Sequence, residues 1–86
     1  MARKIYDTWM NASRASERMI AEGTSVINDL MANVACGNLR YGEDFLLKKF
    51  EFVGCAARVQ IEADEDAIEE IRIDTKRDWQ ETKPLP

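Results

Sequence analysis

Residues 3–35, RKIYDTWMNASRASERMIAEGTSVINDLMANVA, are the stretch that decides the predicted fold. Apolar and small side chains recur in it at spacings of four and three residues, which is the pattern of one face of an α-helix. Polar side chains occupy the opposite face. The stretch therefore predicts one long amphipathic helix, and the rest of the chain is expected to cover its apolar face. That face consists of Ile5, Trp9, Ala12, Ser16, Met19, Gly23, Val26, Leu30 and Val34.

Five further apolar residues widen this face on one flank: Met10, Ile20, Ile27, Met31 and Ala35. A contact between two helices needs only a narrow seam, so the extra width predicts another surface packed on the flank. A chain of 86 residues is small and buries only about 60–65% of its unfolded surface, so a partner would add to its stability. We therefore expect a homodimer in which Ile20, Ile27 and Met31 make the self-association contact.

Two shorter helices are expected after the long one. Cys36-Gly37-Asn38 ends the first helix, because Gly or Asn adopts the left-handed conformation that follows a last helical turn. A second helix is expected from about residue 43 to residue 61, and a third begins at Asp64, a residue type that caps helix N-termini. The predicted fold class is all-α, with the long N-terminal helix packed antiparallel against the two shorter ones in a helical hairpin or bundle.

The predicted domain organisation is a single helical domain over residues 1–80. Residues 81–86 are expected to form a loose C-terminal tail, because Pro84 and Pro86 cannot continue a helix.

An α+β fold is the alternative. Residues 49–53, 58–62 and 70–74 each alternate apolar and polar side chains with the period of two that half-buried strands show. They could form a small antiparallel sheet within residues 47–74. No Asn-Gly or Asp-Gly pair separates them, however, and Ala, Glu, Lys and Leu are abundant, so the helical interpretation is preferred.

Composition indicates a cytoplasmic protein. No apolar run approaches the roughly 20 residues of a membrane span, and no charged-then-apolar leader opens the chain. Cys36 and Cys55 are too far apart for a Cys-x-x-Cys redox or metal pair. We expect both to be free thiols in a reducing compartment; a Cys36–Cys55 disulfide is the alternative.

The sequence contains no motif of catalysis or cofactor binding. It has no histidine, which removes the commonest general base and the commonest metal ligand. No glycine-rich loop matches a nucleotide-binding pattern. We therefore expect a non-enzymatic protein with no cofactor, no metal site and no catalytic residue.

Charge is distributed unevenly along the chain. The formal net charge is −4, yet residues 62–74 alone hold seven acidic residues and one basic residue. This balance argues against direct binding to nucleic acid or to an anionic membrane. The acidic segment predicts a surface that docks on a basic patch of another protein, formed by Glu62, Asp64, Glu65, Asp66, Glu69, Glu70 and Asp74.

The predicted function is protein–protein binding, as an adaptor or a stoichiometric inhibitor. In its strongest form the acidic segment imitates the phosphates of a nucleic acid and so occupies a nucleic-acid-binding enzyme. The alternative function is a structural subunit that assembles with copies of itself through its wide apolar face.

Overall fold

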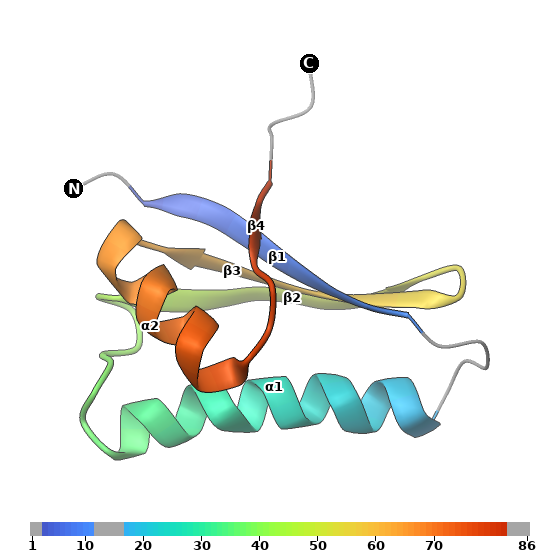
Figure 1. The fold of residues 1–86 in the computed structure, drawn as a ribbon, viewed down its shortest axis with the longest axis horizontal. Helices are drawn as coiled ribbons and strands as arrows, with labels where there is room; N and C mark the ends of the chain where they lie inside the picture. Colours follow the sequence, from blue (N-terminus) through green and yellow to red (C-terminus); the bar gives the residue numbers. More distant parts are fainter. Residues whose placement is uncertain (1–2, 12–16, 83–86) are drawn as a thin grey trace.

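The chain folds as an α+β sandwich in the computed structural model, which describes residues 3–11 and 17–82. The elements in chain order are β1 (Lys4–Asn11), α1 (Glu17–Ala35), β2 (Phe45–Val53), β3 (Ala56–Ala63), α2 (Glu65–Thr75) and β4 (Gln80–Glu81). The four strands form an antiparallel sheet in the order β2-β3-β1-β4, which carries the two helices (Figure 1). This connection of elements is a pair of interleaved βαβ units, the ferredoxin-like arrangement.

The all-α prediction is wrong, and so is the helical bundle built on it. The long helix predicted over residues 3–35 is divided into a strand and a helix, and Ala12 and Ser16 of its apolar face lie outside the described residues. The second predicted helix is the β2–β3 hairpin. The α+β alternative fits, although β1 was not foreseen and residues 70–74 belong to α2.

The pattern of β1 explains the error at the N-terminus. Tyr6, Thr8 and Met10 are buried on the side of the sheet that faces the helices. Ile5 and Trp9 lie on the opposite side, where Trp9 is 44% exposed. Residues four apart share a face in a strand as well as in a helix, so the spacing from Ile5 to Trp9 fits both structures.

The hairpin between β2 and β3 turns at Gly54-Cys55. Gly54 has a φ of 61°, as the first central residue of a type II′ turn requires. Alternate residues of β3 are buried beneath the helices, in agreement with the period of two in residues 58–62. The hairpin therefore forms without the Asn-Gly or Asp-Gly pair whose absence favoured a helix.

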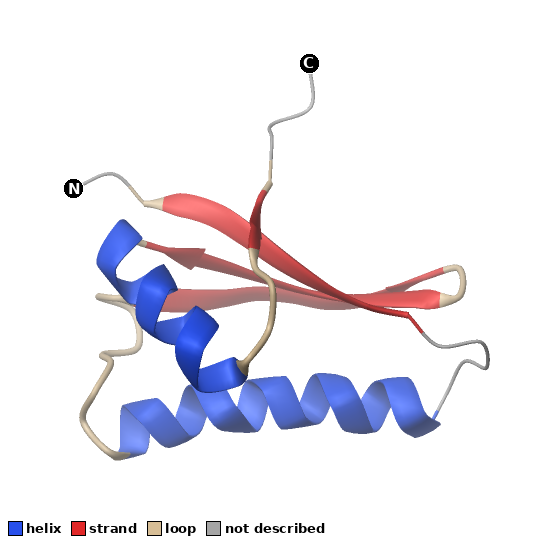
Figure 2. Ribbon diagram, viewed as in Figure 1, coloured by secondary structure: helices blue, strands red, loops and turns tan. Residues whose placement is uncertain are grey.

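Both helices lie on one side of the sheet and bury the core against it (Figure 2). In α1 the predicted face is correct from Met19 onward, since Met19, Gly23, Val26 and Leu30 are buried. Gly23 permits a close approach, because a Cβ there would lie 2.1 Å from the Phe50 ring of β2. The α1 helix ends as predicted, with Gly37 at a φ of 80° after its last turn.

The third predicted helix is confirmed as α2, and its N-cap is Asp64. The Asp64 Oδ1 atom accepts a hydrogen bond of 2.8 Å from the Ala67 amide. Beyond α2, the indole nitrogen of the fully buried Trp79 donates a 2.9 Å hydrogen bond to Thr75 Oγ1.

The C-terminal segment is attached to β1. The predicted domain boundary at residue 80 falls inside β4, and the Thr82 amide donates a 2.8 Å hydrogen bond to the carbonyl oxygen of Ile5. Residues 83–86, the remainder of the expected tail, lie outside the described residues. In the part of the chain that the structure describes, neither helix is long and apolar enough to cross a membrane.

Candidate acidic binding face

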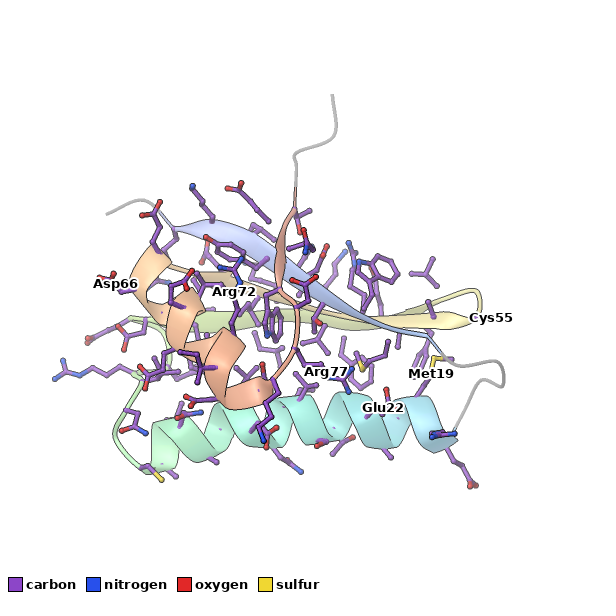
Figure 3. The ribbon with its side chains drawn as sticks, viewed as in Figure 1. Met19, Glu22, Cys55, Asp66, Arg72 and Arg77 are labelled. Atoms are coloured by element: carbon purple, nitrogen blue, oxygen red, sulfur yellow. The ribbon has the colours of Figure 1, made fainter. Side chains whose placement is uncertain are left out.

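The outer side of α2 carries most of the predicted acidic surface. The helix buries Ala67, Ile68, Ile71 and Thr75 against the core, which turns the positions between them toward solvent. Asp66, Glu70 and Asp74 follow one another at intervals of four residues, so they form a row with a rise of about 6 Å per step. Figure 3 shows Asp66 at the outer side of the helix.

Four of the seven predicted acids are engaged within the chain. Asp64 is the N-cap of α2, and Glu62 lies on β3, 3.6 Å from the Arg3 guanidinium. Glu65 lies 3.5 Å from Lys4 Nζ, and Glu69 lies 2.7 Å from Arg72 Nη1. The prediction treated the seven carboxylates as equal, whereas the fold gives these four an internal role.

Asp66, Glu70 and Asp74 differ from those four. Among the residues that the structure describes, no Lys or Arg nitrogen lies within 4.0 Å of their carboxylate oxygens. Arg72, the basic residue of α2, points inward: its Nη2 donates a 2.7 Å hydrogen bond to the Trp79 carbonyl oxygen (Figure 3). The row therefore presents uncompensated negative charge.

A shallow pocket of about 210 Å³ adds another carboxylate to this face. It lies at the N-terminal end of α2, beside the loop that precedes β2. Asp44, which sequence reasoning placed at a helix start, contributes to it from this loop, where its Oδ2 accepts a 2.7 Å hydrogen bond from the Arg40 amide. The lining residues are Asn38, Leu39, Asp44, Asp64, Asp66, Ala67 and Glu70.

No signal in the sequence joins Asp44 to the acids of α2. The two segments meet through the pairing of β2 with β3, in which Phe45 is opposite Ala63. Within residues 3–11 and 17–82, no group of three or more acidic or cysteine side chains is placed to hold a metal ion.

An exposed apolar residue lies beside the acidic row. Ile73 is 74% exposed, the largest value among the large apolar side chains of the described chain. It follows Glu69 by four residues and Glu70 by three, so these side chains are its neighbours on the helix surface. An apolar side chain within a charged rim is the typical anatomy of a protein interface. In the sequence analysis Ile73 falls only within residues 70–74, one of the alternating segments that could form a strand.

The open side of the sheet holds a second charged cluster, in which one arginine lies between two carboxylates. The Arg58 guanidinium forms ion pairs with Glu51 and, at 3.7 Å, with Asp7. It also lies 5.5 Å from the centre of the Trp9 ring. Thr82 Oγ1 donates a 2.8 Å hydrogen bond to Asp7, whereas the buried Nε of Arg58 has no hydrogen-bond partner among the described residues.

The residues predicted for self-association lie on the flank of α1 that faces away from α2. Glu22, on the other flank, is 3.5 Å from Arg77, which follows α2 (Figure 3). Ile20 is 49% exposed, whereas Ile27 and Met31 are half-buried and Met31 packs against the core.

Comparisons of the chain with protein-family models, with curated proteins and with solved structures found no match.

Proposed function

We propose that the protein binds another protein by docking the outer face of α2 on a basic surface, and that it acts without catalysis as an adaptor or stoichiometric inhibitor. The observation that carries the proposal is the row of Asp66, Glu70 and Asp74, for which the described residues supply no countercharge. A partner's lysines or arginines would supply it.

The energetics favour such a partner. Like charges four residues apart on a helix cost a few tenths of a kcal/mol per pair, so the free protein bears a small cost that a basic surface removes. Opposite charges also steer the encounter and raise the association rate. Ile73 supplies an apolar contact at the same place, and a few well-packed, desolvated residues contribute most of the affinity in protein interfaces.

The regular spacing of the row supports a more specific partner, a nucleic-acid-binding enzyme. A line of carboxylates about 6 Å apart resembles the evenly spaced charges of a phosphate backbone. Such an enzyme already offers a groove of Lys and Arg side chains that bind phosphate. The proposal places the protein in the cytoplasm, which agrees with two exposed and unpaired cysteines, Cys36 and Cys55.

The test is a charge reversal with a matched control. Asp66→Lys combined with Glu70→Lys reverses the row at two positions, one of them in the first turn of α2. Glu17→Lys combined with Asp29→Lys makes the same change in net charge on α1, again with one residue in the first turn. Each variant and the original chain are used as bait in lysate, and retained proteins are identified by mass spectrometry across a salt gradient.

The proposal would be supported by a stoichiometric partner that moderate salt releases. The α1 variant should retain this partner, and the α2 variant should lose it. Retention of the same partner by the α2 variant would refute it. A double-stranded oligonucleotide added in competition separates the two forms of the proposal, because it displaces the protein only from a nucleic-acid-binding groove.

A further inference from the structure

The outer edge of β2 is covered over only half of its length. β2 is the last strand of the sheet on its side. The loop before it covers the first half: the Gly42 amide donates a 2.8 Å hydrogen bond to the Phe45 carbonyl oxygen, and the Leu47 amide donates one of 3.3 Å to the Tyr41 hydroxyl. No described residue pairs with the outer edge of residues 49–53.

The direction of the free backbone groups follows from the register. Leu47 is opposite Ile61 of β3, and its amide points away from β3 toward Tyr41. Adjacent pairs of an antiparallel ladder alternate between inward and outward backbone groups. After the irregularity at Lys48, Lys49 is opposite Gln60, and its backbone amide and carbonyl groups point toward β3. Phe50 is opposite Val59 in the next pair, so its amide and carbonyl groups point away from β3.

Residues of opposite charge flank Phe50 in this segment. Lys49 precedes it and Glu51 follows it, and both lie on the open side of the sheet. Glu51 binds Arg58 of its own chain through Oε1, and among the described residues its Oε2 has no ion-pair or hydrogen-bond partner. We propose that β2 pairs antiparallel with β2 of a second copy of this chain, about a two-fold axis at Phe50, to form a continuous eight-stranded sheet. The two Phe50 residues then exchange amide–carbonyl hydrogen bonds, and each Lys49 is opposite the Glu51 of the other copy.

The neighbouring registers lack this complementarity. A two-fold axis at Glu51 places the two Glu51 carboxylates opposite each other, and like charges directly opposite are destabilising. An axis at Phe52 places Lys49 opposite the exposed Cys55 and leaves Glu51 opposite Val53. Only the axis at Phe50 forms two ion pairs and also uses backbone groups that point outward.

The pairing also covers apolar surface on the helix side of the sheet. Phe52 is 52% exposed, and its ring centre lies 5.4 Å from that of Phe50. In the proposed register each Phe52 is a diagonal neighbour of the Phe50 of the other copy, within reach of an aromatic side chain. Lysines and an irregularity such as that at Lys48 normally protect an edge from foreign strands. Here Glu51 of a second copy complements Lys49.

The first experiment is sedimentation of the full chain at concentrations up to about 1 mM. We expect a dimer that Lys49→Glu weakens by at least about tenfold in dissociation constant, because each new glutamate meets the Glu51 of the other copy. Lys48→Glu is the matched control: it makes the same charge change one residue earlier, opposite Phe52, and it should leave the dimer nearly unchanged. Circular dichroism checks that both variants are folded.

A second measurement uses the unaltered protein. A carbodiimide joins lysine amines to carboxylates in contact, and a mixture of ¹⁵N-labelled and unlabelled chains distinguishes cross-links between copies from those within one copy. We expect a mixed-isotope Lys49–Glu51 cross-link. A monomer at every concentration would overturn the proposal. So would a dimer that Lys49→Glu leaves intact, or cross-links formed only within single copies.

Discussion

The carboxylates on the acidic face of α2 and those on the open face of the sheet differ in whether a cation of the chain lies beside them. On the sheet, Asp7 is only 8% exposed, and Arg58 provides the countercharge for both Asp7 and Glu51. On α2, Asp66 and Asp74 are exposed, and no cation of the described residues lies within ion-pair distance. The first set has a countercharge within the chain, whereas the second has none among the described residues.

The difference shows that charge density along a sequence does not measure available charge. Arg3 and Lys4 neutralise Glu62 and Glu65 from the far end of the chain, so the fold divides a uniform acidic run into compensated and free members. Four sets of substitutions test this difference, and they are given in order of decreasing expected effect on the free energy of unfolding.

Arg58→Met should have the largest effect. The substitution leaves the nearly buried Asp7 and its neighbour Glu51 without their shared cation, and removing one partner of a buried ion pair costs about 3 kcal/mol. Urea unfolding followed by circular dichroism measures the loss. A free energy of unfolding within about 0.5 kcal/mol of that of the original chain would mean that the ion pairs on the sheet contribute as little to stability as exposed surface charges do.

Asp64→Ala should destabilise the protein by about 1 kcal/mol, because it removes the side chain that caps α2. Asp64→Asn is the control, since asparagine caps a helix nearly as well without charge. Urea unfolding of both variants therefore separates capping from charge. Equal losses in the two variants would assign the role of Asp64 to its charge instead.

Local signals predicted the start of α2 correctly, whereas β1 depends on a long-range pairing that no local signal shows. Asp64 and the acids after it specify a helix start within a few residues. Ile5 and Trp9 are four residues apart, a spacing that suits a helix or a strand, and the decision depends on pairing with β3 about 50 residues later. The β2–β3 hairpin could have been predicted from the sequence, because apolar and polar residues alternate in residues 49–53 and 58–62 and Gly54 lies between the two segments.

The acidic segment of the candidate site was predicted from the distribution of charge along residues 62–74, and most of that segment lies on α2. Its three free members could not be identified, because the partners of Glu62 and Glu65 are residues Arg3 and Lys4. Asp44 was missed for the same reason, since only strand pairing brings its loop to the start of α2.

Glu70→Gln combined with Asp74→Asn should stabilise the protein slightly, by about 0.5 kcal/mol. The change removes repulsion along the row, and Asp74 also lies in the last turn of α2, where the helix dipole disfavours a negative charge. Urea unfolding at low salt measures the gain, which should shrink in high salt. A destabilised variant would show that these carboxylates stabilise the fold, which would contradict the interpretation that they are uncompensated.

Lys4→Met should have the smallest effect on the free energy of unfolding, and this effect should depend on pH only under alkaline conditions. The negative charge of Glu81, 3.4 Å from Lys4 Nζ, and then that of Glu65 raise the pKa of Lys4 above its ordinary value. A raised pKa in the folded state stabilises the protein fully below the pKa of the unfolded chain, about 10.4, and this contribution is lost as the pH rises through the folded pKa. The difference in the free energy of unfolding between the original chain and Lys4→Met should therefore be constant between about pH 6 and pH 9 and decrease at higher pH. A difference independent of pH up to the most alkaline conditions would mean that the contribution of Lys4 comes from its methylene groups, and that Glu65 belongs with the free acids of α2.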